Sequence, residues 1–521
     1  MKEQFSKEMM EAFKMEGAYF TIGGAMIDGE CLTDNLVNIP LRTLNRHGLI
    51  AGATGTGKTK TLQIFAEQLS AQSIPVLMMD MKGDLSGIAA KSEGHPKIDE
   101  RHEKIGIPFQ AGDSPVEFLT LSDERGTKLR ATVTEFGPVL FSKILDLTPT
   151  QEGVVAVTFK FCDDQQLPLL DLKDMRKALQ YITGVGKKDF EKEYGRVSTA
   201  SVGAITRKII ELEQQGADKF FGERTFDVDD LLRIDDQGRG MVSIVRLTDL
   251  QGKPKLFSTF MLQMLAEIYA NFPEEGDLEQ PKLVIFIDEA HLVFDNASKV
   301  LKSQIESIIK LIRSKGVGIF FVTQNPTDIP DDVLSQLGLK VQHALRAFTA
   351  KDRKAIKLSA QNFPITDYYE VDELLTSLGI GEALVTALNE EGIPTPLVHC
   401  LLRAPQSRMD ILTKAEIDEI IGKSTIITKY NEKIDRESAY EILTAKIEEA
   451  ATEEHHKKVT KQKRGRKKKE KSAVETVVDS TLLKQVGRTV ARELTRGLLG
   501  VLGVKTTNRR SSSKRNKGLF W

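Results

Sequence analysis

Cysteine is scarce in this sequence, and long apolar segments are missing. The 521 residues include three cysteines, Cys31, Cys162 and Cys400, and no two of them form a C-x-x-C pair. This spacing excludes a disulfide framework and a cysteine zinc site, so a reducing compartment is expected. No apolar run approaches the ~18 residues of a membrane-spanning helix, and residues 1–8 carry mixed charge, unlike a signal peptide. We therefore expect a cytoplasmic protein without a transmembrane segment.

Net charge is also almost absent, at −1 for the whole chain. This total hides a split, because residues 457–521 contain twenty Lys and Arg against four Asp and Glu, a net charge of +16. Residues 1–456 are left with about −17. A basic tail on an acidic body predicts that the tail, rather than the body surface, contacts polyanions such as nucleic acid.

One glycine-rich stretch, residues 52–59, matches the phosphate-loop (Walker A) pattern G-x-x-x-x-G-K-[ST] without a mismatch. A short apolar run precedes it at residues 47–51, and apolar residues recur at helical spacing over residues 61–69. Strand, loop and helix together favour a nucleotide site over a Gly/Thr-rich turn without a ligand, because the loop N–H groups and the helix start attract phosphate. The predicted loop consists of Gly52, Ala53, Thr54, Gly55, Thr56, Gly57, Lys58 and Thr59.

A second anchor is the apolar run of residues 283–287, which ends in Asp288 and Glu289 (Walker B). Five consecutive large apolar residues predict a strand buried on both faces. In phosphate-loop NTPases the acid at this place helps to hold Mg²⁺ together with the loop hydroxyl, here Thr59, while Lys58 reaches the β- and γ-phosphates. Glu289 would orient and deprotonate the attacking water. The alternative is an acidic pair that caps the following helix.

Polar residues also end two further predicted strands. Residues 316–323 lead to Gln324, which is either a sensor of hydrolysis or the start of a turn that Pro326 completes. Residues 75–79 lead to Asp80 and then Asp84, which either lie near the phosphates, as expected beyond the carboxyl ends of parallel strands, or belong to a turn. Both pairs of alternatives stay open.

The chain is predicted to be an α/β protein with a RecA-like P-loop NTPase core and a mainly parallel sheet. Residues 1–45 are a lead-in or small β cap, and residues 46–408 are the core. A core of this kind does not need some 200 residues between its two anchors, so about 100–235 is expected to be a helical insertion. A helical extension (409–456), a disordered basic linker (457–480) and a basic amphipathic helix with a tail (481–521) follow.

The final predicted helix has an apolar and a basic face. Leu482, Val486, Val490, Leu494, Leu498 and Leu502 recur every four residues, and four basic residues recur at the same interval with an offset of two: Lys484, Arg488, Arg492 and Arg496. Such a helix can dock on another subunit, lie on an anionic membrane or contact nucleic acid.

The two anchors, the Thr323-Gln324 ending and their order resemble the HerA/FtsK superfamily of RecA-like motor ATPases. Residues 45–59 and 80–85 carry the closest likeness, which extends over roughly residues 20–505 and is greatest toward bacterial HerA-like helicases. The resemblance implies ATP and Mg²⁺ as cofactors. It also implies a homo-oligomeric ring, usually a hexamer, with ATP bound between neighbouring subunits.

In such a ring an arginine of the next subunit stabilises the transferring phosphoryl group. The resemblance places Arg313 at that position, in trans, and Arg46 at a second nucleotide-binding arginine position. The alternative for both is an ordinary surface or ion-paired arginine. One departure is that HerA proteins carry a substantial N-terminal β-barrel, for which residues 1–45 are too short. Coupling to a nuclease partner through such a barrel is therefore not expected.

The favoured function is an ATP-hydrolysing ring motor, a DNA translocase or helicase. The alternative from a different class is an ATPase regulator or assembly module that acts on a protein or membrane partner. The stretch Asp288-Glu289-Ala290-His291 also suggests a two-domain DEAH-type helicase. The second RecA domain of that class, with its arginine-rich motif and Ser-Ala-Thr segment, is not visible after residue 291.

Overall fold

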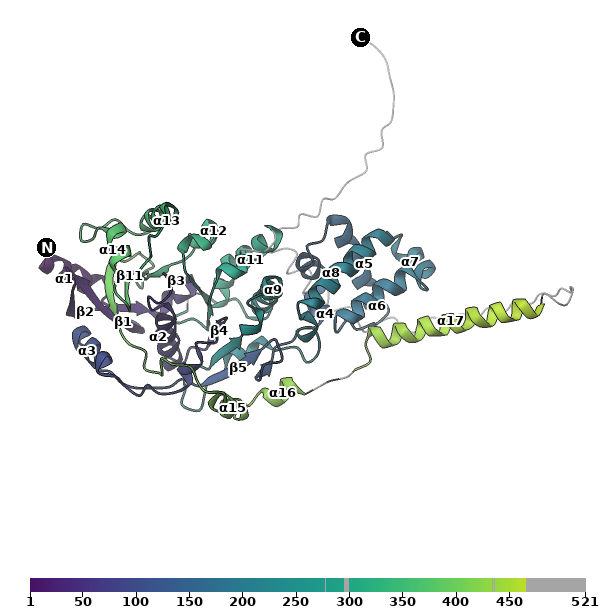
Figure 1. The fold of residues 1–521 in the computed structure, drawn as a ribbon, viewed down its shortest axis with the longest axis horizontal. Helices are drawn as coiled ribbons and strands as arrows, with labels where there is room; N and C mark the ends of the chain where they lie inside the picture. Colours follow the sequence, from purple (N-terminus) through teal and green to yellow (C-terminus); the bar gives the residue numbers. More distant parts are fainter. Residues whose placement is uncertain (277, 295–298, 433, 435, 465–521) are drawn as a thin grey trace, which may run out of the picture. The chain divides into compact units, whose positions relative to one another are not determined.

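One large sheet organises the chain (Figure 1). The computed structural model describes residues 1–464 apart from 277, 295–298, 433 and 435. Across the described part the sheet has twelve strands in the order β2-β1-β12-β11-β10-β3-β9-β8-β4-β7-β5-β6. The strands are β1 (Tyr19–Ile27), β2 (Glu30–Pro40), β3 (Gly48–Ala51), β4 (Val76–Asp80), β5 (Val116–Thr120), β6 (Thr127–Lys128), β7 (Val242–Arg246), β8 (Leu283–Ile287), β9 (Val317–Thr323), β10 (Leu339–Gln342), β11 (Glu382–Thr386) and β12 (Val398–Leu402).

The sheet has a parallel and an antiparallel part. The strands from β10 through β3, β9, β8, β4, β7 and β5 to β6 run parallel. At the other edge, β10, β11, β12, β1 and β2 pair antiparallel. All residues of β8 and β9 are buried, as expected for central strands covered on both faces. The carboxyl ends of β3, β9, β8 and β4 therefore meet at one edge of the sheet.

Helices cover both faces of this sheet (Figure 1). On one face Phe65 of α2 and Phe5 of α1 share a buried cluster with Phe286 of β8. On the opposite face Phe294 of α10 packs against Phe321 of β9, with ring centroids 6.0 Å apart. The larger helices are α1 (Lys2–Ala12), α2 (Lys58–Ala71), α3 (Pro96–Ile105), α4 (Val133–Ile144), α5 (Pro149–Asp164), α6 (Leu172–Thr183), α7 (Lys187–Tyr194), α8 (Thr199–Gln214), α9 (Pro254–Asn271), α11 (Lys299–Ile312), α13 (Ala350–Ala360), α15 (Lys414–Gly422) and α17 (Ala439–Arg464); the shorter ones are α10 (His291–Phe294), α12 (Asp331–Leu334), α14 (Val371–Ser377) and α16 (Ile427–Asn431).

The structure differs from the predicted helical insertion at about 100–235. Its amino-terminal part holds β5 and β6, which extend the parallel sheet beyond β7. The helical portion runs from α4 to α8, and α17 packs against its helix α6. There the backbone N–H of Tyr440 donates to Asp174 at 2.8 Å. Strand β5 is hard to recognise in the sequence for two reasons. It is short, so its local pattern is weak, and its pairing partner β7 lies more than a hundred residues away.

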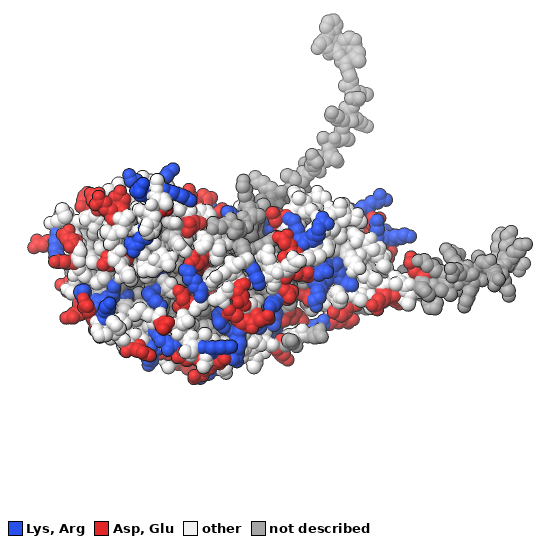
Figure 2. Space-filling view, in the orientation of Figure 1, with Lys and Arg blue, Asp and Glu red and all other residues white. Residues whose placement is uncertain are grey.

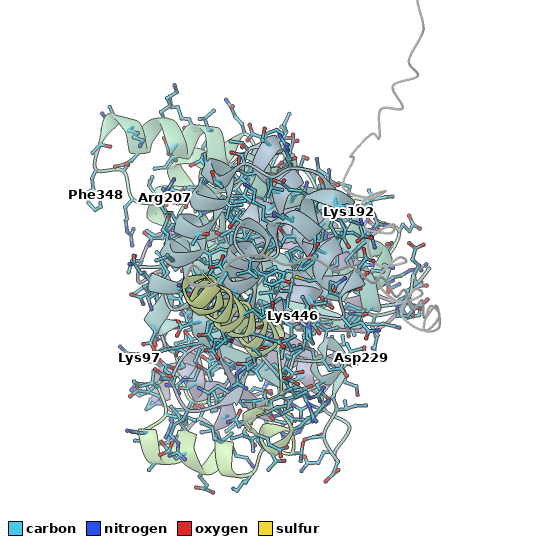
Figure 3. The ribbon with its side chains drawn as sticks, turned by 90° about the vertical axis from the view of Figure 1, so that its right-hand side faces the viewer. Lys97, Lys192, Arg207, Asp229, Phe348 and Lys446 are labelled. Atoms are coloured by element: carbon cyan, nitrogen blue, oxygen red, sulfur yellow. The ribbon has the colours of Figure 1, made fainter. Side chains whose placement is uncertain are left out.

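The carboxyl-terminal segments differ in part from their prediction. Helix α17 extends to Arg464, so residues 457–464 of the predicted disordered linker are helical. Lysine is a good helix former, which allows the helix to continue into the basic stretch. In Figure 3 this helix points toward the viewer and Lys446 marks it. The rest of the linker and the predicted amphipathic helix at 481–521 lie outside the described residues.

The surface and the helices bear on two further expectations. Figure 2 shows Lys and Arg interspersed with Asp and Glu over the face in view, and the expected polyanion contact of the tail stays a prediction. In the described part of the chain, no helix combines the length and apolarity required to cross a membrane.

A buried histidine, His47, joins three elements just ahead of β3. Its Nδ1 accepts the backbone N–H of Ile319 at 3.0 Å, and its Nε2 lies 2.8 Å from the carbonyl oxygen of Ile309. The ring therefore donates through one nitrogen and accepts through the other, which is the neutral form. The pKa of His47 is lowered to about 4, chiefly by burial and also by the positive charge of Arg313, while the hydrogen bond to Ile309 opposes the change.

We expect His47 to make the fold sensitive to acid. Its folded pKa is depressed below the unfolded value of about 6.5, so its contribution to stability is complete above pH ~6.5 and is lost as the pH falls toward 4. Chemical unfolding at pH 7.5 and pH 5 measures this loss, at about 1–2 kcal/mol. His47→Gln should remove most of it, whereas His95→Gln, which alters the exposed N-cap of α3, should not. Equal acid sensitivity in both variants would contradict this expectation.

Candidate functional site

The predicted phosphate loop connects β3 to α2. Its backbone has positive φ at Gly52, Gly55 and Gly57. At Gly52 a Cβ would lie 2.5 Å from the Cβ of His343, so only glycine fits there. Within the described residues, no hydrogen bond is formed by the backbone N–H groups of the loop from Thr54 to Gly57. Such a row of free donors ahead of a helix start suits an anion.

A polar network supports this loop from behind. The backbone N–H of His343 donates to Ala51 at 2.7 Å, and its Nε2 lies 2.9 Å from the hydroxyl of Thr61 in α2. Burial lowers the pKa of His343 to about 4, so the ring is neutral at pH 7. From the other side the N–H of Gly381 donates to the carbonyl of Thr56 at 3.1 Å.

The turn that carries Gly381 is itself fixed by Arg101 of α3. The guanidinium donates to the carbonyl oxygens of Gly381 at 3.1 Å and Ile380 at 3.0 Å. The loop thus rests on elements from β10, from the β11 side of the sheet and, through this turn, from α3. Rigid support of this kind reduces the entropy that ligand binding must remove.

The predicted metal acid and loop hydroxyl lie at the same sheet edge. Asp288 follows β8, and its side chain is buried. The pKa of Asp288 is raised to about 7, chiefly by burial and also by the carboxylates of Glu289 and Asp84, while the Lys82 ammonium opposes the change. The hydroxyl of Thr59 lies 3.3 Å from the Oδ2 of Asp84.

The sequence left two alternatives for Asp80 and Asp84, a place in a turn or a place near the phosphate loop. In the structure the first applies to Asp80 and the second to Asp84. Asp80 shapes the turn, because its carboxylate accepts the backbone N–H of Gly83 at 2.6 Å and that of Leu85 at 3.4 Å. Burial raises the pKa of Asp80 to about 6. Asp84 instead faces the loop through its contact with Thr59.

These residues fit Mg²⁺. One oxygen each of Asp288 and Asp84 is buried without a hydrogen-bond partner in the described structure. Together with the Thr59 hydroxyl they form a set of hard oxygen donors, which Mg²⁺ prefers in company with phosphate oxygens. Lys58 lies beside them, with its ammonium donating to the Ala53 carbonyl at 3.1 Å. Burial lowers the pKa of Lys58, and the neighbouring Lys82 lowers it further.

Glu289 lies next to the metal acid with its side chain 9% exposed. Its backbone has a φ of 48°, in the left-handed region that non-glycine residues rarely adopt. One oxygen of its carboxylate forms an ion pair with Lys82, and the Nδ1 of His291 lies 3.2 Å from the other oxygen. A carboxylate held in this way at the phosphate edge can act as a general base.

Gln324 is exposed at the end of β9. The preceding residue, Thr323, is hydrogen-bonded through its carbonyl to the N–H of Gly52 at 3.2 Å, so Gln324 follows directly beside the start of the phosphate loop. The turn begins one residue later, where the Asp328 carboxylate accepts the N–H of Asn325 at 3.1 Å. The sensor role of Gln324 stays a prediction.

The structure places both predicted arginines away from their own loop. Arg313 is exposed and precedes β9, and Arg46 precedes β3 and accepts the N–H of Gly338 through its carbonyl at 2.9 Å. Both therefore lie at the amino-terminal edge of the parallel strands, whereas the phosphate loop lies at the carboxyl edge. The expected contact of either arginine with a nucleotide is therefore one with a neighbouring copy of the chain, and both roles stay predictions.

Sequence reasoning missed three contributors to this edge: Lys82, His343 and the contact of His291 with Glu289. Lys82 stands in the turn between Asp80 and Asp84, so its place in the sequence was a usable signal. No local pattern marks His343, because it reaches the loop by the pairing of β10 with β3.

Comparison with known proteins gives sequence relatives across most of the chain. The family model described as "Helicase HerA-like C-terminal" matches residues 28–507. "DNA double-strand break repair helicase HerA" of Sulfolobus acidocaldarius is 23% identical over 384 residues, which are 72% of this chain and 69% of the relative. The protein of the same name from Sulfurisphaera tokodaii is 25% identical over 362 residues, 68% of this chain and 64% of the relative. The chain thus spans about two thirds of the length of these relatives.

A solved structure supports the fold. The plasmid coupling protein TrwB, in complex with a non-hydrolysable ATP analogue, superposes with a TM-score of 0.50 at 14% identity, covering 78% of this chain and 95% of TrwB. The predicted α/β class and RecA-like P-loop fold are confirmed by this likeness and by the largely parallel sheet.

The resemblance noted in the sequence is also confirmed, whereas its bacterial subgroup stays a prediction. The matched residues, 28–507, include the phosphate loop, the acidic pair and the strand that ends at Thr323. The chain belongs to the helicase HerA-like C-terminal family.

Proposed function

We propose that this chain hydrolyses ATP with Mg²⁺ and uses the energy to move along DNA as a ring of identical subunits. The observation that carries the hydrolytic part is the position of Glu289, a buried carboxylate directly after the metal acid Asp288 and across from the phosphate loop. DNA as the substrate is supported by the names of the relatives, which are DNA repair helicases.

Each group at the edge has a defined task in this proposal. The N–H groups of the loop and the Lys58 ammonium bind the phosphates, and Thr59 and Asp288 hold the metal ion. Glu289 orients a water molecule and accepts its proton. Bound MgATP supplies the phosphoryl group that is transferred to this water.

The placement of Arg313 supports the proposed ring. Phosphoryl transfer needs a cation that stabilises the developing charge. Arg313 cannot supply it to its own loop, because the two lie at opposite edges of the parallel strands. A ring in which the amino-terminal edge of one subunit meets the carboxyl edge of the next would supply it, and a hexamer is the expected size.

DNA should stimulate ATP hydrolysis, and its binding should depend steeply on salt. The twenty basic residues of 457–521 can contact phosphates, and each neutralised duplex phosphate adds about −0.9 to the slope of log K against log salt. Deleting 457–521 should therefore flatten the slope, whereas Lys58→Ala, with an intact tail, should keep it. Three measurements test the proposal. ATPase rates with duplex and single-stranded DNA test the hydrolysis and its stimulation, binding titrations at several salt concentrations test the DNA contact, and the native mass tests the ring.

A second candidate is an ATPase that regulates or assembles a protein or membrane partner. The amphipathic pattern from Leu482 to Leu502 favours it, because an apolar helix face needs a surface on which to dock. This candidate would be favoured over the motor by two results together. Deletion of 457–521 would abolish liposome or protein binding, and DNA would affect neither the full chain nor the deletion variant. A cytoplasmic location stays a prediction from composition.

A further inference from the structure

Lys82 is a cation at the catalytic edge that the phosphate-loop pattern does not include. It stands in the turn after β4, and β4 pairs parallel to β8 with Met79 opposite Ile287. Lys82 is thus three residues beyond this pair and Glu289 two residues beyond it, which brings both past the carboxyl ends of adjacent strands. Their side chains meet in an ion pair.

The environments of the two partners differ. The side chain of Lys82 is 39% exposed, whereas that of Glu289 is 9% exposed. Lys82 therefore reaches from solvent to a carboxylate that is shielded from water and lies next to a second buried carboxylate, Asp288. Lys82 thus brings a positive charge to a place where two buried carboxylates lie next to each other.

The ion pair with Lys82 also constrains the direction in which the Glu289 carboxylate points. Lys82 forms an ion pair with one oxygen of Glu289, and the Nδ1 of His291 lies 3.2 Å from the other oxygen. The backbone of Glu289 has a φ of 48°, a conformation that costs free energy and persists only where surrounding contacts fix it. A general base acts only when it points at the proton that it accepts.

We propose that Lys82 is a positioning residue that fixes the carboxylate of Glu289 for water activation. The inference rests on the proposed ATP hydrolysis and adds a residue to that site. Lys82 acts through Glu289, so its removal should slow turnover without weakening nucleotide binding.

The first test separates turnover from binding. Lys82→Ala should lower kcat about 10- to 100-fold, part of the factor that a general base contributes. The Kd for a fluorescent non-hydrolysable ATP analogue should change less than about twofold. Lys82→Arg keeps a long cation and should recover most of kcat, whereas the neutral Lys82→Gln should not.

The second test asks whether Lys82 acts through Glu289. In a Glu289→Gln background, Lys82→Ala should cause little further loss, because residues that act as one unit are not additive. The matched control is Lys282→Ala. Lys282 forms an ion pair with Glu275 at the amino-terminal end of β8, so its loss removes a comparable contact far from the phosphates. This control should leave kcat unchanged.

The outcomes distinguish this inference from the proposed function. If the wild-type chain hydrolyses no ATP, the proposed function fails. If it does hydrolyse ATP and Lys82→Ala retains kcat, loses analogue binding as strongly as kcat, or adds its full loss to that of Glu289→Gln, the positioning role is overturned while the ATPase stands. Thermal unfolding of each variant shows whether it still folds. If Lys82→Ala does not fold, the comparison of Lys82→Arg with Lys82→Gln decides whether the positive charge is required.

Discussion

Glu289→Gln is expected to bind MgATP about as well as the wild-type chain and to hydrolyse it about 10² to 10⁴ times more slowly. The amide has nearly the same shape as the carboxylate but cannot accept the proton of the attacking water. Asp288, Thr59 and the loop N–H groups remain, so the phosphates and the metal ion keep their contacts. Single-turnover hydrolysis and titration with a fluorescent ATP analogue measure the two quantities separately.

Lys58→Ala serves as the matched comparison. It removes the ammonium beside the loop, so binding and turnover should fall together. A Glu289→Gln protein that hydrolyses ATP at a rate close to wild type would show that the base lies elsewhere. The phosphate loop and its metal acid would still define a nucleotide site, but the hydrolytic assignment of Glu289 would be wrong.

Arg313→Ala should lower turnover about 10³-fold or more while nucleotide binding is retained, as expected for an arginine that stabilises the transferring phosphoryl group. Arg313 is exposed at the amino-terminal edge of β9, so the proposal predicts that the loss acts on a neighbouring subunit. Lys310→Ala is the matched control, because Lys310 is a basic residue of α11, the helix that ends at Ile312 directly before Arg313, and it pairs with Asp332 at 3.4 Å.

Mixing two inactive proteins tests the shared site. In a mixed ring of Arg313→Ala and Lys58→Ala subunits, some interfaces combine an intact loop with an intact arginine. Hydrolysis should therefore return in the mixture, in proportion to such interfaces. No recovery, with mixed rings demonstrated by native mass, would reject the action of Arg313 in trans and leave the ATPase itself in place.

Most of the sheet core could be predicted from local pattern. The runs that became β3, β4, β8 and β9 are apolar throughout and end in polar or glycine residues, which is typical of buried parallel strands. Prediction failed for β5 and β6, because they are short and pair with or beside β7 from far along the chain.

The candidate site likewise has a part that the sequence predicts and a part that it does not. Gly52 to Thr59 and Asp288 to Glu289 are contiguous motifs, and their chemistry follows from residue type and spacing alone. Lys82 carries no such motif, and its role depends on the register between β4 and β8. Asp80 and Asp84 could not be told apart in the sequence, and the turn between them separated a structural acid from one that faces Thr59.

The sequence by itself determined that this chain has a phosphate-loop motif, an acidic pair after an apolar run and a basic tail, because each is a local run of residue types. Only the tertiary structure decided which of these groups meet. Parallel pairing brings the ends of β3, β4 and β8 to one edge, where Lys82 contacts Glu289. The same pairing sends Arg313 to the opposite edge, since a residue before a parallel strand and one after it are separated by the strand's length. Distances of this kind arise from register between remote segments, which no single stretch of sequence contains.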